Sequence, residues 1–304
     1  MKNKYLLCRP QGGLNDMLCQ IEKCCRYAEL TKRVVIVDTN YQHSSYFKDD
    51  LCNYFQSNQN KLILSIRGYE KELEKLSVSP SFLQGVIFNY ETVLPDKNLI
   101  HLEAKTKLPI TFDFSRDHDE DLLIYHQMGG GDVAFVTLLR MRLKDSLLGE
   151  LEKRYQLIGE NFSAIHIRNT DYESSYDEVL GDLKCNPPEK LFLATDNSNV
   201  LADFRSALER TEIFSFSKSL SGNKEPIHVF KDMNFDQIKQ RNEDAILDLL
   251  LLALSSKLYL VKIKKLYFSR RDYSGFSILA SRLNNSKIIL KQFLGKTNIK
   301  IGLD

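Results

Sequence analysis

The sequence predicts an α/β protein with two facing domains, each built on a parallel β-sheet, and a cleft between them. Short apolar segments of strand length alternate with longer segments of helical periodicity, as is typical of β-α-β units and parallel sheets. This alternation begins twice, near residue 4 and again near residue 162. The length of 304 residues also suits two domains.

The first β-α-β unit occupies the start of the chain. Residues 4–8 are apolar and are expected to form a buried strand, residues 9–16 form a glycine-containing turn, and residues 17–30 have helical periodicity. The next strand is expected over residues 34–37, ending at Asp38. Because the turn joins the carboxyl end of a strand to a helix, it is a place where α/β proteins bind ligands.

The sequence signals for the remaining elements differ in strength along the chain, and they are weakest between residues 41 and 121. Between residues 41 and 121 only residues 85–88 form a candidate strand. A helix is predicted over residues 132–155, and we expect the two domains to comprise residues 1–157 and 158–304. The second domain is expected to contain strands over residues 162–167 and 191–194 and helices over residues 199–209 and 242–256.

The composition is that of a soluble globular protein, with 43% apolar and 27% charged residues and a formal charge of +2. No apolar window approaches the roughly 20 residues of a membrane span, and the N-terminus lacks the apolar core of a secretory signal. We therefore expect a cytoplasmic location. Residues 257–304 hold 11 Lys or Arg residues against Asp272 and Asp304, so this end could face solvent, anionic lipid or a diphosphate. No motif supports nucleic-acid binding.

The cysteines and histidines do not have the spacing of zinc sites, and the six cysteines are expected to be reduced thiols. No metal or other cofactor is expected. An alternative to a metal-free protein is a metal-dependent glycosyltransferase. Asp119 and Asp121 form a D-x-D pair that could bridge Mn²⁺ or Mg²⁺ to a diphosphate. This pair lies in a charged run that is more typical of a solvated loop.

Polar residues follow the predicted strands of the second half. Arg168 and Asp171 come after the strand over residues 162–167, and Asp196 comes after the next strand. A guanidinium at this sheet edge can hold a phosphate with two hydrogen bonds. Ser274 and Gly275 precede an apolar helical segment, whose first N–H groups could bind an anion.

Taken together, these segments resemble the superfamily of α1,2-, α1,6- and protein O-fucosyltransferases. Residues 9–15 look like its GGL/GN turn, residues 166–172 resemble its H-x-R-R-T/G-D-Y/K signature, and residues 273–280 are similar to its S-x-F-S-x-x-A segment. Asp196 and Asp248 fall where the superfamily carries aspartates. Asn169 replaces the second arginine of the signature, and Arg270 or Arg271 are candidates to substitute for it.

The resemblance implies a GT-B-like protein with two Rossmann-like domains, acting as an inverting, metal-independent glycosyltransferase that uses GDP-fucose. The second domain would hold the donor, and the first would face a glycan acceptor. The implied catalytic residues are Arg168, Asp171, Asn15 and Asp16, the donor-binding residues are His166, Arg168, Asp196, Asp248, Ser274, Gly275, Phe276 and Ser277, and the turn contributes Gly12 and Gly13. Asp16 and Asp171 are alternative candidates for the base, and His166 could instead be structural.

The expected role is modification of a surface polysaccharide, such as an O-antigen, a capsule or an oligosaccharide precursor. The acceptor could be lipid-linked, and the protein could bind peripherally to the inner face of the cytoplasmic membrane. Two alternatives remain open: a GT-B enzyme that uses another nucleotide sugar, and a non-catalytic module that binds a nucleotide sugar or glycan. Asn169 motivates the second alternative, because an arginine is missing there.

Overall fold

The structure is a computed structural model that describes residues 3–41, 46–94, 100–169, 174–217, 233–264 and 272–302. The chain divides into two compact units, Met1–Arg142 and Leu143–Asp304. This division falls earlier than the expected one after residue 157, because helix α4 (Asp145–Ile158) packs against helix α7 (Phe235–Leu254) of the second unit.

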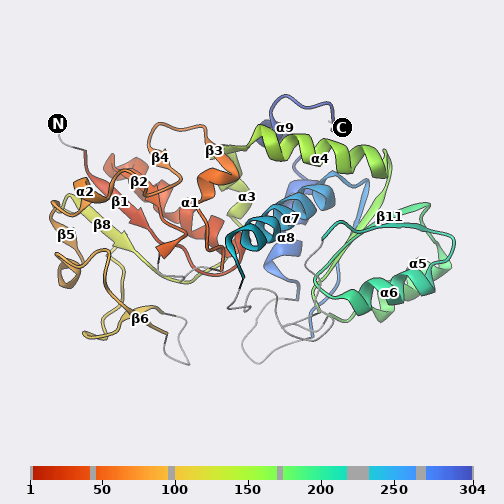
Figure 1. Ribbon diagram of the computed structural model, residues 1–304, viewed down its shortest axis with the longest axis horizontal. Helices are drawn as coiled ribbons and strands as arrows, with labels where there is room; N and C mark the ends of the chain where they lie inside the picture. Colours follow the sequence, from red (N-terminus) through yellow and green to blue (C-terminus); the bar gives the residue numbers. More distant parts are fainter. Residues whose placement is uncertain are drawn as a thin grey trace. The chain divides into compact units, whose positions relative to one another are not determined.

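The first unit contains a five-stranded sheet and the turns and short helices that cover it (Figure 1). Its elements are β1 (Tyr5–Cys8), α1 (Leu14–Thr31), β2 (Val34–Val37), η2 (Leu51–Asn53), β3 (Phe55–Ser57), β4 (Leu62–Ile63), α2 (Glu70–Leu73), β5 (Val78–Ser79), η3 (Ser81–Leu83), β6 (Thr92–Val93), β7 (Leu102–Glu103), β8 (Leu122–Tyr125), α3 (Ala134–Thr137), η4 (Leu138–Arg140) and β9 (Met141–Leu143), which crosses the boundary.

The sheet of the first unit has the strand order β4-β2-β1-β8-β5, and all its paired strands are parallel. Strand β1 is central and every one of its residues is buried. Tyr5 and Leu7 face one hydrophobic cluster, and helix α1 packs against β1 and β2. A strand covered on both faces needs a continuous apolar sequence rather than an alternating one, which is why residues 5–8 were recognisable.

The second unit also contains a parallel sheet (Figure 1). After α4 its elements are β10 (Ser163–Ile167), α5 (Asp177–Cys185), β11 (Lys190–Thr195), α6 (Ser198–Ala207), β12 (Glu212–Phe214), α7, β13 (Lys257–Tyr259), α8 (Gly275–Asn284) and α9 (Lys287–Leu294). The strand order is β12-β11-β10-β13.

The two faces of the second sheet have different partners. Ile165 and Ile167 of β10 belong to a hydrophobic cluster with residues of α5 and α6. His166 lies between them, and its ring contacts Ser277 and Phe276 of α8. Successive side chains of a strand point to opposite faces of the sheet, so this alternation directs one polar residue of β10 towards α8.

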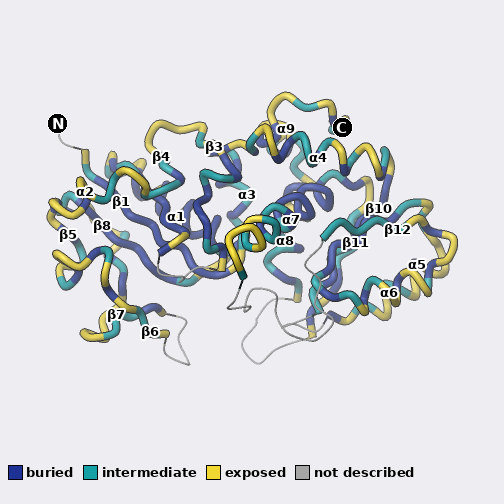
Figure 2. Tube along the Cα trace, in the orientation of Figure 1, coloured by how far each residue is buried: buried dark blue, intermediate teal, exposed yellow. Residues whose placement is uncertain are grey.

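Helix α7 changes character along its 20 residues. Figure 2 shows its first half exposed and its second half buried, where it packs against α8, β10 and β11. The buried half carries two carboxylates, Asp244 and Asp248. In the part of the chain that the structure describes, no helix is long and apolar enough to cross a membrane.

The α/β class with two parallel sheets is confirmed, and two predicted elements are wrong. Residues 85–88 form turns rather than a strand. The helix predicted over residues 132–155 is interrupted by β9, which pairs with β3. Met141, Arg142 and Leu143 alternate buried, exposed and buried, a pattern too short to distinguish from a helix without the partner strand.

Candidate functional site

Three strands of the second sheet end in polar residues at the same edge. Arg168 and Asn169 follow β10, Asp196 and Asn197 follow β11, and Ser217 lies shortly after β12. Because these strands are parallel neighbours, their carboxyl ends meet at one edge. This is the edge at which open α/β sheets bind ligands.

Hydrogen bonds connect the ends of β10 and β11. The backbone N–H of Asn169 donates to Oδ1 of Asp196 at 2.8 Å, and Nδ2 of Asn197 donates to the carbonyl of Asn169 at 2.9 Å. Oδ1 of Asn197 also accepts from the N-terminal N–H groups of α6. The backbone of Asn169 therefore orients Asp196, a role that requires no arginine side chain at this position.

His166 is held by two serines at the start of α8. Its Nδ1 lies 2.8 Å from Oγ of Ser277, and Oγ of Ser274 donates to Oγ of Ser277 at 3.0 Å. The Phe276 ring packs against the imidazole, with 4.7 Å between the ring centroids. The direction of the bond between Nδ1 and Ser277 depends on the tautomer of His166. When Ser277 donates to Nδ1, His166 carries its proton on Nε2.

The imidazole of His166 is neutral. Burial, together with a smaller effect of the positive charge of Arg168, lowers its pKa from 6.5 to about 3. A neutral His with an N–H at Nε2 is a hydrogen-bond donor without a charge. Arg168 follows His166 by two residues, just after the end of β10, and its charge contributes to this shift.

The beginning of α8 is suited to bind an anion. The first four N–H groups of a helix have no intrahelical partner; here Ser277 N–H donates to the side chain of Ser274, and Ile278 N–H donates to its carbonyl. The N–H groups of Gly275 and Phe276 remain at the positive end of the helix. These two amides can bind a phosphate. The Ser274 hydroxyl caps the helix, and its role in donor binding stays a prediction.

Asp248 belongs to a different cluster of the second unit. Its Oδ2 accepts a hydrogen bond from Ser217 at 2.5 Å, and its Oδ1 lies 4.0 Å from Nη1 of Arg154 on α4. Burial raises the pKa of Asp248 to about 7, with a smaller upward contribution from Asp244 and opposing effects of Ser217 and Arg154. The sequence did not single out Arg154, because its buried partner Asp244 lies 90 residues further along the chain.

The turn after β1 holds the two glycines of the first unit. Gly12 has φ of +99°, and a Cβ there would lie 3.1 Å from Cβ of Asp16, so this position requires glycine. Gly13 is the N-cap residue of α1. Gln11 N–H donates to Oε1 of Gln20, and Nε2 of Gln20 donates back to the carbonyl of Gln11 at 2.7 Å.

Asn15 and Asp16 lie in the first turn of α1, and Asn15 is buried. Nδ2 of Asn15 donates to Oδ1 of Asp16 at 3.1 Å and to the carbonyl of Gly131 at 3.2 Å. The turn that contains Gly131 is thereby attached to the start of α1. Asp171, the other candidate base, lies outside the described residues, as do Arg270 and Arg271.

A groove with a volume of about 300 Å³ opens along α1. Its lining combines apolar side chains with charged ones of both signs: Cys19, Glu22, Lys23, Arg26, Tyr27, Leu30, Phe114 and Val133. Nζ of Lys23 lies 3.9 Å from the centroid of the Phe114 ring, within the range of a cation–π contact. A Cβ at Gly131 would lie 3.5 Å from Sγ of Cys19, so the groove begins beside the turn that Asn15 holds.

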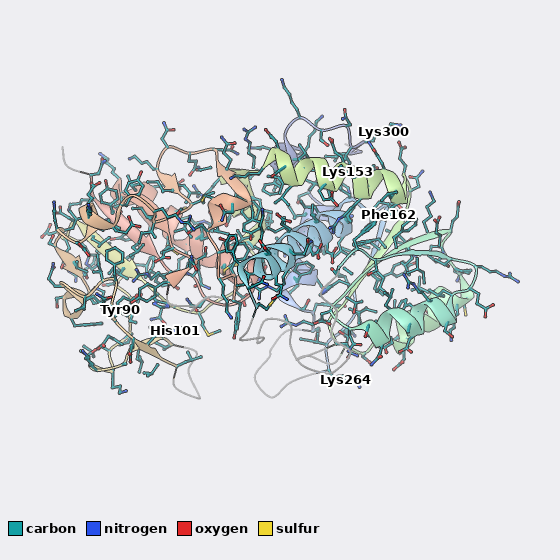
Figure 3. The ribbon with its side chains drawn as sticks, viewed as in Figure 1. Tyr90, His101, Lys153, Phe162, Lys264 and Lys300 are labelled. Atoms are coloured by element: carbon teal, nitrogen blue, oxygen red, sulfur yellow. The ribbon has the colours of Figure 1, made fainter. Side chains whose placement is uncertain are left out.

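A buried polar network lies at the start of the turn after β1, where it includes Arg9. Arg9 donates to Asp38 at 2.8 Å and to the Tyr90 hydroxyl at 2.9 Å, and its guanidinium carbon lies 3.5 Å from the Tyr41 ring centroid. The Tyr90 hydroxyl also bonds His126, whose ring stacks on His101; Figure 3 labels Tyr90 and His101 on the same side of this unit. Burial lowers the pKa of His126 well below 6.5, so the network contains neutral imidazole.

The D-x-D pair lies away from the strand-end residues of its own sheet. Asp119 and Asp121 precede β8, at the amino end of the strand, whereas the turn after β1 lies at the carboxyl edge of that sheet. Asp121 is fixed there by backbone hydrogen bonds with Tyr5 and the Ser77 side chain. Across the described ranges, no group of three or more His, Cys, Asp or Glu residues is arranged to hold a metal ion.

Comparison with known proteins gives matches only at the level of structure. Neither a family model nor a curated relative matches the sequence. The fucosyltransferase NodZ from Bradyrhizobium is similar with a TM-score of 0.61 and 16% identity, covering 93% of this chain and 94% of the other. POFUT1 in its apo form gives a TM-score of 0.53 and 9% identity, covering 93% and 95%. Arabidopsis thaliana FUT1, a mutant in complex with GDP, gives 0.51 and 13%, covering 93% and 69%.

These neighbours are all fucosyltransferases of the GT-B type. The resemblance seen in the sequence is therefore confirmed for the fold over nearly the whole chain. Identities of 9–16% carry no information about individual site residues, so the roles of those residues must be argued from their chemistry.

Proposed function

We propose that this chain is an inverting, metal-independent glycosyltransferase that transfers fucose from GDP-fucose to a glycan acceptor. The observation that carries the proposal is the cluster at the carboxyl edge of the second sheet, where Arg168, neutral His166 and the start of α8 meet. This cluster occurs in a chain whose fold is that of fucosyltransferases. One NodZ structure contains GDP, which shows that a protein of this fold binds the nucleotide.

The cluster suits a leaving nucleoside diphosphate. As the bond between the sugar and the phosphate breaks, negative charge grows on the diphosphate and the sugar becomes oxocarbenium-like. Arg168 would neutralise that charge, and the amides of Gly275 and Phe276 would donate to the phosphate oxygens. His166 would add an uncharged donor through Nε2. Each such donor is worth about 10²- to 10³-fold in rate when it is preorganised.

Inversion follows from a single displacement at the anomeric carbon. The acceptor hydroxyl attacks on the face opposite the diphosphate, a new glycosidic bond forms as the bond to phosphate breaks, and a carboxylate takes the hydroxyl proton. Asp16 and Asp171 are the candidate bases. The groove beside the turn of α1 is a candidate binding surface for part of the acceptor.

Metal independence is supported by the groups that replace a cation. In metal-dependent transferases, Mg²⁺ or Mn²⁺ neutralises the diphosphate. A fixed guanidinium and a helix N-terminus provide positive charge at the same place. The transfer is therefore expected to continue in EDTA.

The first experiment is thermal unfolding with GDP, GDP-fucose, GDP-mannose, UDP, CDP and CMP, each with and without EDTA. A ligand at 100 times its dissociation constant adds about 2.7 kcal/mol to the free energy of unfolding. We expect stabilisation by GDP and GDP-fucose that EDTA does not change. Stronger stabilisation by another nucleotide would mean that the donor is not GDP-fucose. Loss of the stabilisation in EDTA would contradict metal independence.

Turnover separates an enzyme from a binding module. GDP release from GDP-fucose should accelerate when an oligosaccharide acceptor is added. GDP-fucose binding without turnover across an acceptor screen would instead favour a non-catalytic module, the alternative that Asn169 motivates.

We extend the proposal to a surface polysaccharide acceptor, such as an O-antigen or capsule precursor, modified on the cytoplasmic face of the membrane. Lys262 and Lys264 support the membrane contact, because both are exposed while the alternating residues Val261 and Ile263 are buried (Figure 3 labels Lys264). Lys265 lies outside the described residues. Replacing all three lysines by Gln should weaken co-sedimentation with anionic liposomes, and unchanged co-sedimentation would refute the contact.

A further inference from the structure

Arg154 and the two carboxylates of α7 form a buried group in the second unit. Nη2 of Arg154 donates to Oδ1 of Asp244 at 2.8 Å, and Nη1 of Arg154 lies 4.0 Å from Oδ1 of Asp248. Both Arg154 and Asp248 are 6% exposed. A distance of 4.0 Å is too long for a hydrogen bond, so Arg154 is hydrogen-bonded to Asp244 but not to Asp248.

Among the described residues, Nη1 of Arg154 and Oδ1 of Asp248 are both buried without a hydrogen-bond partner. Buried polar atoms are nearly always satisfied, and an unsatisfied one is destabilising. Here an unsatisfied donor, Nη1 of Arg154, lies 4.0 Å from an unsatisfied acceptor, Oδ1 of Asp248. A single ligand group with a neighbouring acceptor and donor would satisfy both atoms.

The other atoms of the two side chains are fixed by the protein. Ser217 donates to Oδ2 of Asp248, and Asp244 holds Nη2 of Arg154. The Phe216 ring centroid lies 5.4 Å from Cζ of Arg154, and Phe216 stacks on Phe192 of β11. These contacts orient Nη1 and Oδ1 in a buried position, where a hydrogen bond to a charged group is stronger than in water.

The edge of a guanine base has the complementary pattern. Guanine presents the O6 acceptor beside the ring N1–H, followed by the 2-amino donor, whereas adenine presents a 6-amino donor where guanine has O6. We propose that Arg154 is a specificity-determining residue for the donor nucleotide, donating from Nη1 to O6 of guanine while Asp248 accepts from N1–H and the 2-amino group. This inference rests on the proposed use of a GDP-sugar, and it adds a residue that the sequence motifs did not contain.

The same geometry predicts discrimination against other bases. Adenine would place an amino group against the Nη1 donor, so two donors would face each other and neither would be satisfied. Loss of one correct base contact typically changes affinity by about tenfold or more. If Arg154 and Asp248 formed only a structural ion pair, or were bridged only by water, the binding affinity would not depend on the group at position 6 of the purine.

The test uses calorimetric titration of the full chain with GDP and 6-thio-GDP. The sulfur of 6-thio-GDP is a weak acceptor, while its N1–H and 2-amino group remain available to Asp248. Wild-type protein should bind GDP at least tenfold more tightly than 6-thio-GDP, and Arg154→Met should bind the two with equal affinity. Lys153→Met changes an exposed residue on the same helix (labelled in Figure 3) and should retain the wild-type ratio.

The analogue comparison on wild-type protein keeps the inference testable if Arg154→Met folds poorly. Equal binding of GDP and 6-thio-GDP by wild-type protein would overturn the role of Arg154 while leaving the use of GDP intact. Tighter binding of UDP or ADP than of GDP would overturn the proposed donor, and the inference with it. An Arg154→Met variant that keeps the wild-type ratio of affinities would also overturn the inference.

Discussion

The turn after β1 and the strand ends of the second sheet occupy equivalent places in their units but have different hydrogen bonding. In the first unit the polar side chains bond mainly to one another, as in the reciprocal pair Gln11 and Gln20 and the pair Arg9 and Asp38. Among the described residues both units keep buried polar atoms without a partner, such as Nη2 of Arg9 and Oδ1 of Asn15 in the first. In the second unit an unsatisfied donor of Arg154 and an unsatisfied acceptor of Asp248 lie only 4.0 Å apart, and α8 presents its first amides.

This difference separates residues that maintain the fold from residues that act on a ligand. Substitution in the first network should lower the free energy of unfolding, because it leaves buried polar groups without partners. Substitution at the second sheet edge should mainly change nucleotide binding or turnover. The following substitutions test that separation.

Arg9→Met should reduce the free energy of unfolding by about 3–5 kcal/mol, because it leaves the carboxylate of Asp38 buried without its partner. Urea denaturation measures this change. Arg142→Met is the control, since Arg142 is an exposed residue that bonds Gln56, and its effect should stay within about 0.5 kcal/mol. A loss of less than about 1 kcal/mol for Arg9→Met would contradict the structural role of the network.

Arg168→Ala should reduce kcat by about 10²- to 10³-fold, or about 2.7–4 kcal/mol of transition-state stabilisation, with no loss of thermal stability. GDP release and the melting temperature provide the two measurements. Arg205→Ala, an exposed position on α6, should leave both unchanged. Full activity in Arg168→Ala would exclude the proposed phosphate contact.

Ser277→Ala should weaken donor binding by about tenfold, because His166 loses the hydroxyl that fixes its tautomer. NMR of the imidazole nitrogens reports the tautomer directly, and KM for the donor reports the binding. The matched control is Ser281→Ala, four residues further along α8. If KM rose while the tautomer stayed the same, Ser277 would act on the ligand and not through His166.

A fourth prediction concerns the pH dependence of stability. Burial raises the pKa of Asp248 from 3.8 to about 7, so the folded protein holds this proton over a range in which the unfolded chain has lost it. Its contribution to the free energy of unfolding therefore falls as pH rises from about 4 to 7. The difference in free energy of unfolding between wild-type protein and Asp248→Asn, measured by urea denaturation at several pH values, should show this slope. The same difference for Asp182→Asn, an exposed position, should not change with pH.

Much of the fold was predictable because some segments carry local signals. Residues 5–8 and 34–37 are continuous apolar runs, as buried parallel strands require. The motif residues of the second half were predictable in the same way, since Arg168 and Asp196 directly follow buried strands. Strand β9 was missed because a three-residue strand is defined by its partner rather than by its own sequence.

The class of each segment and the residue types at the strand ends follow from local sequence, because hydrophobic periodicity and turn chemistry act over a few neighbouring residues. Which side chains meet depends on the packing of the folded chain. This packing bonds Ser277 to His166 across 111 residues and Arg154 to Asp244 across 90. Contacts at such separations depend on how whole elements pack, and that packing sets the burial that makes His166 neutral and leaves Asp248 paired on one side only.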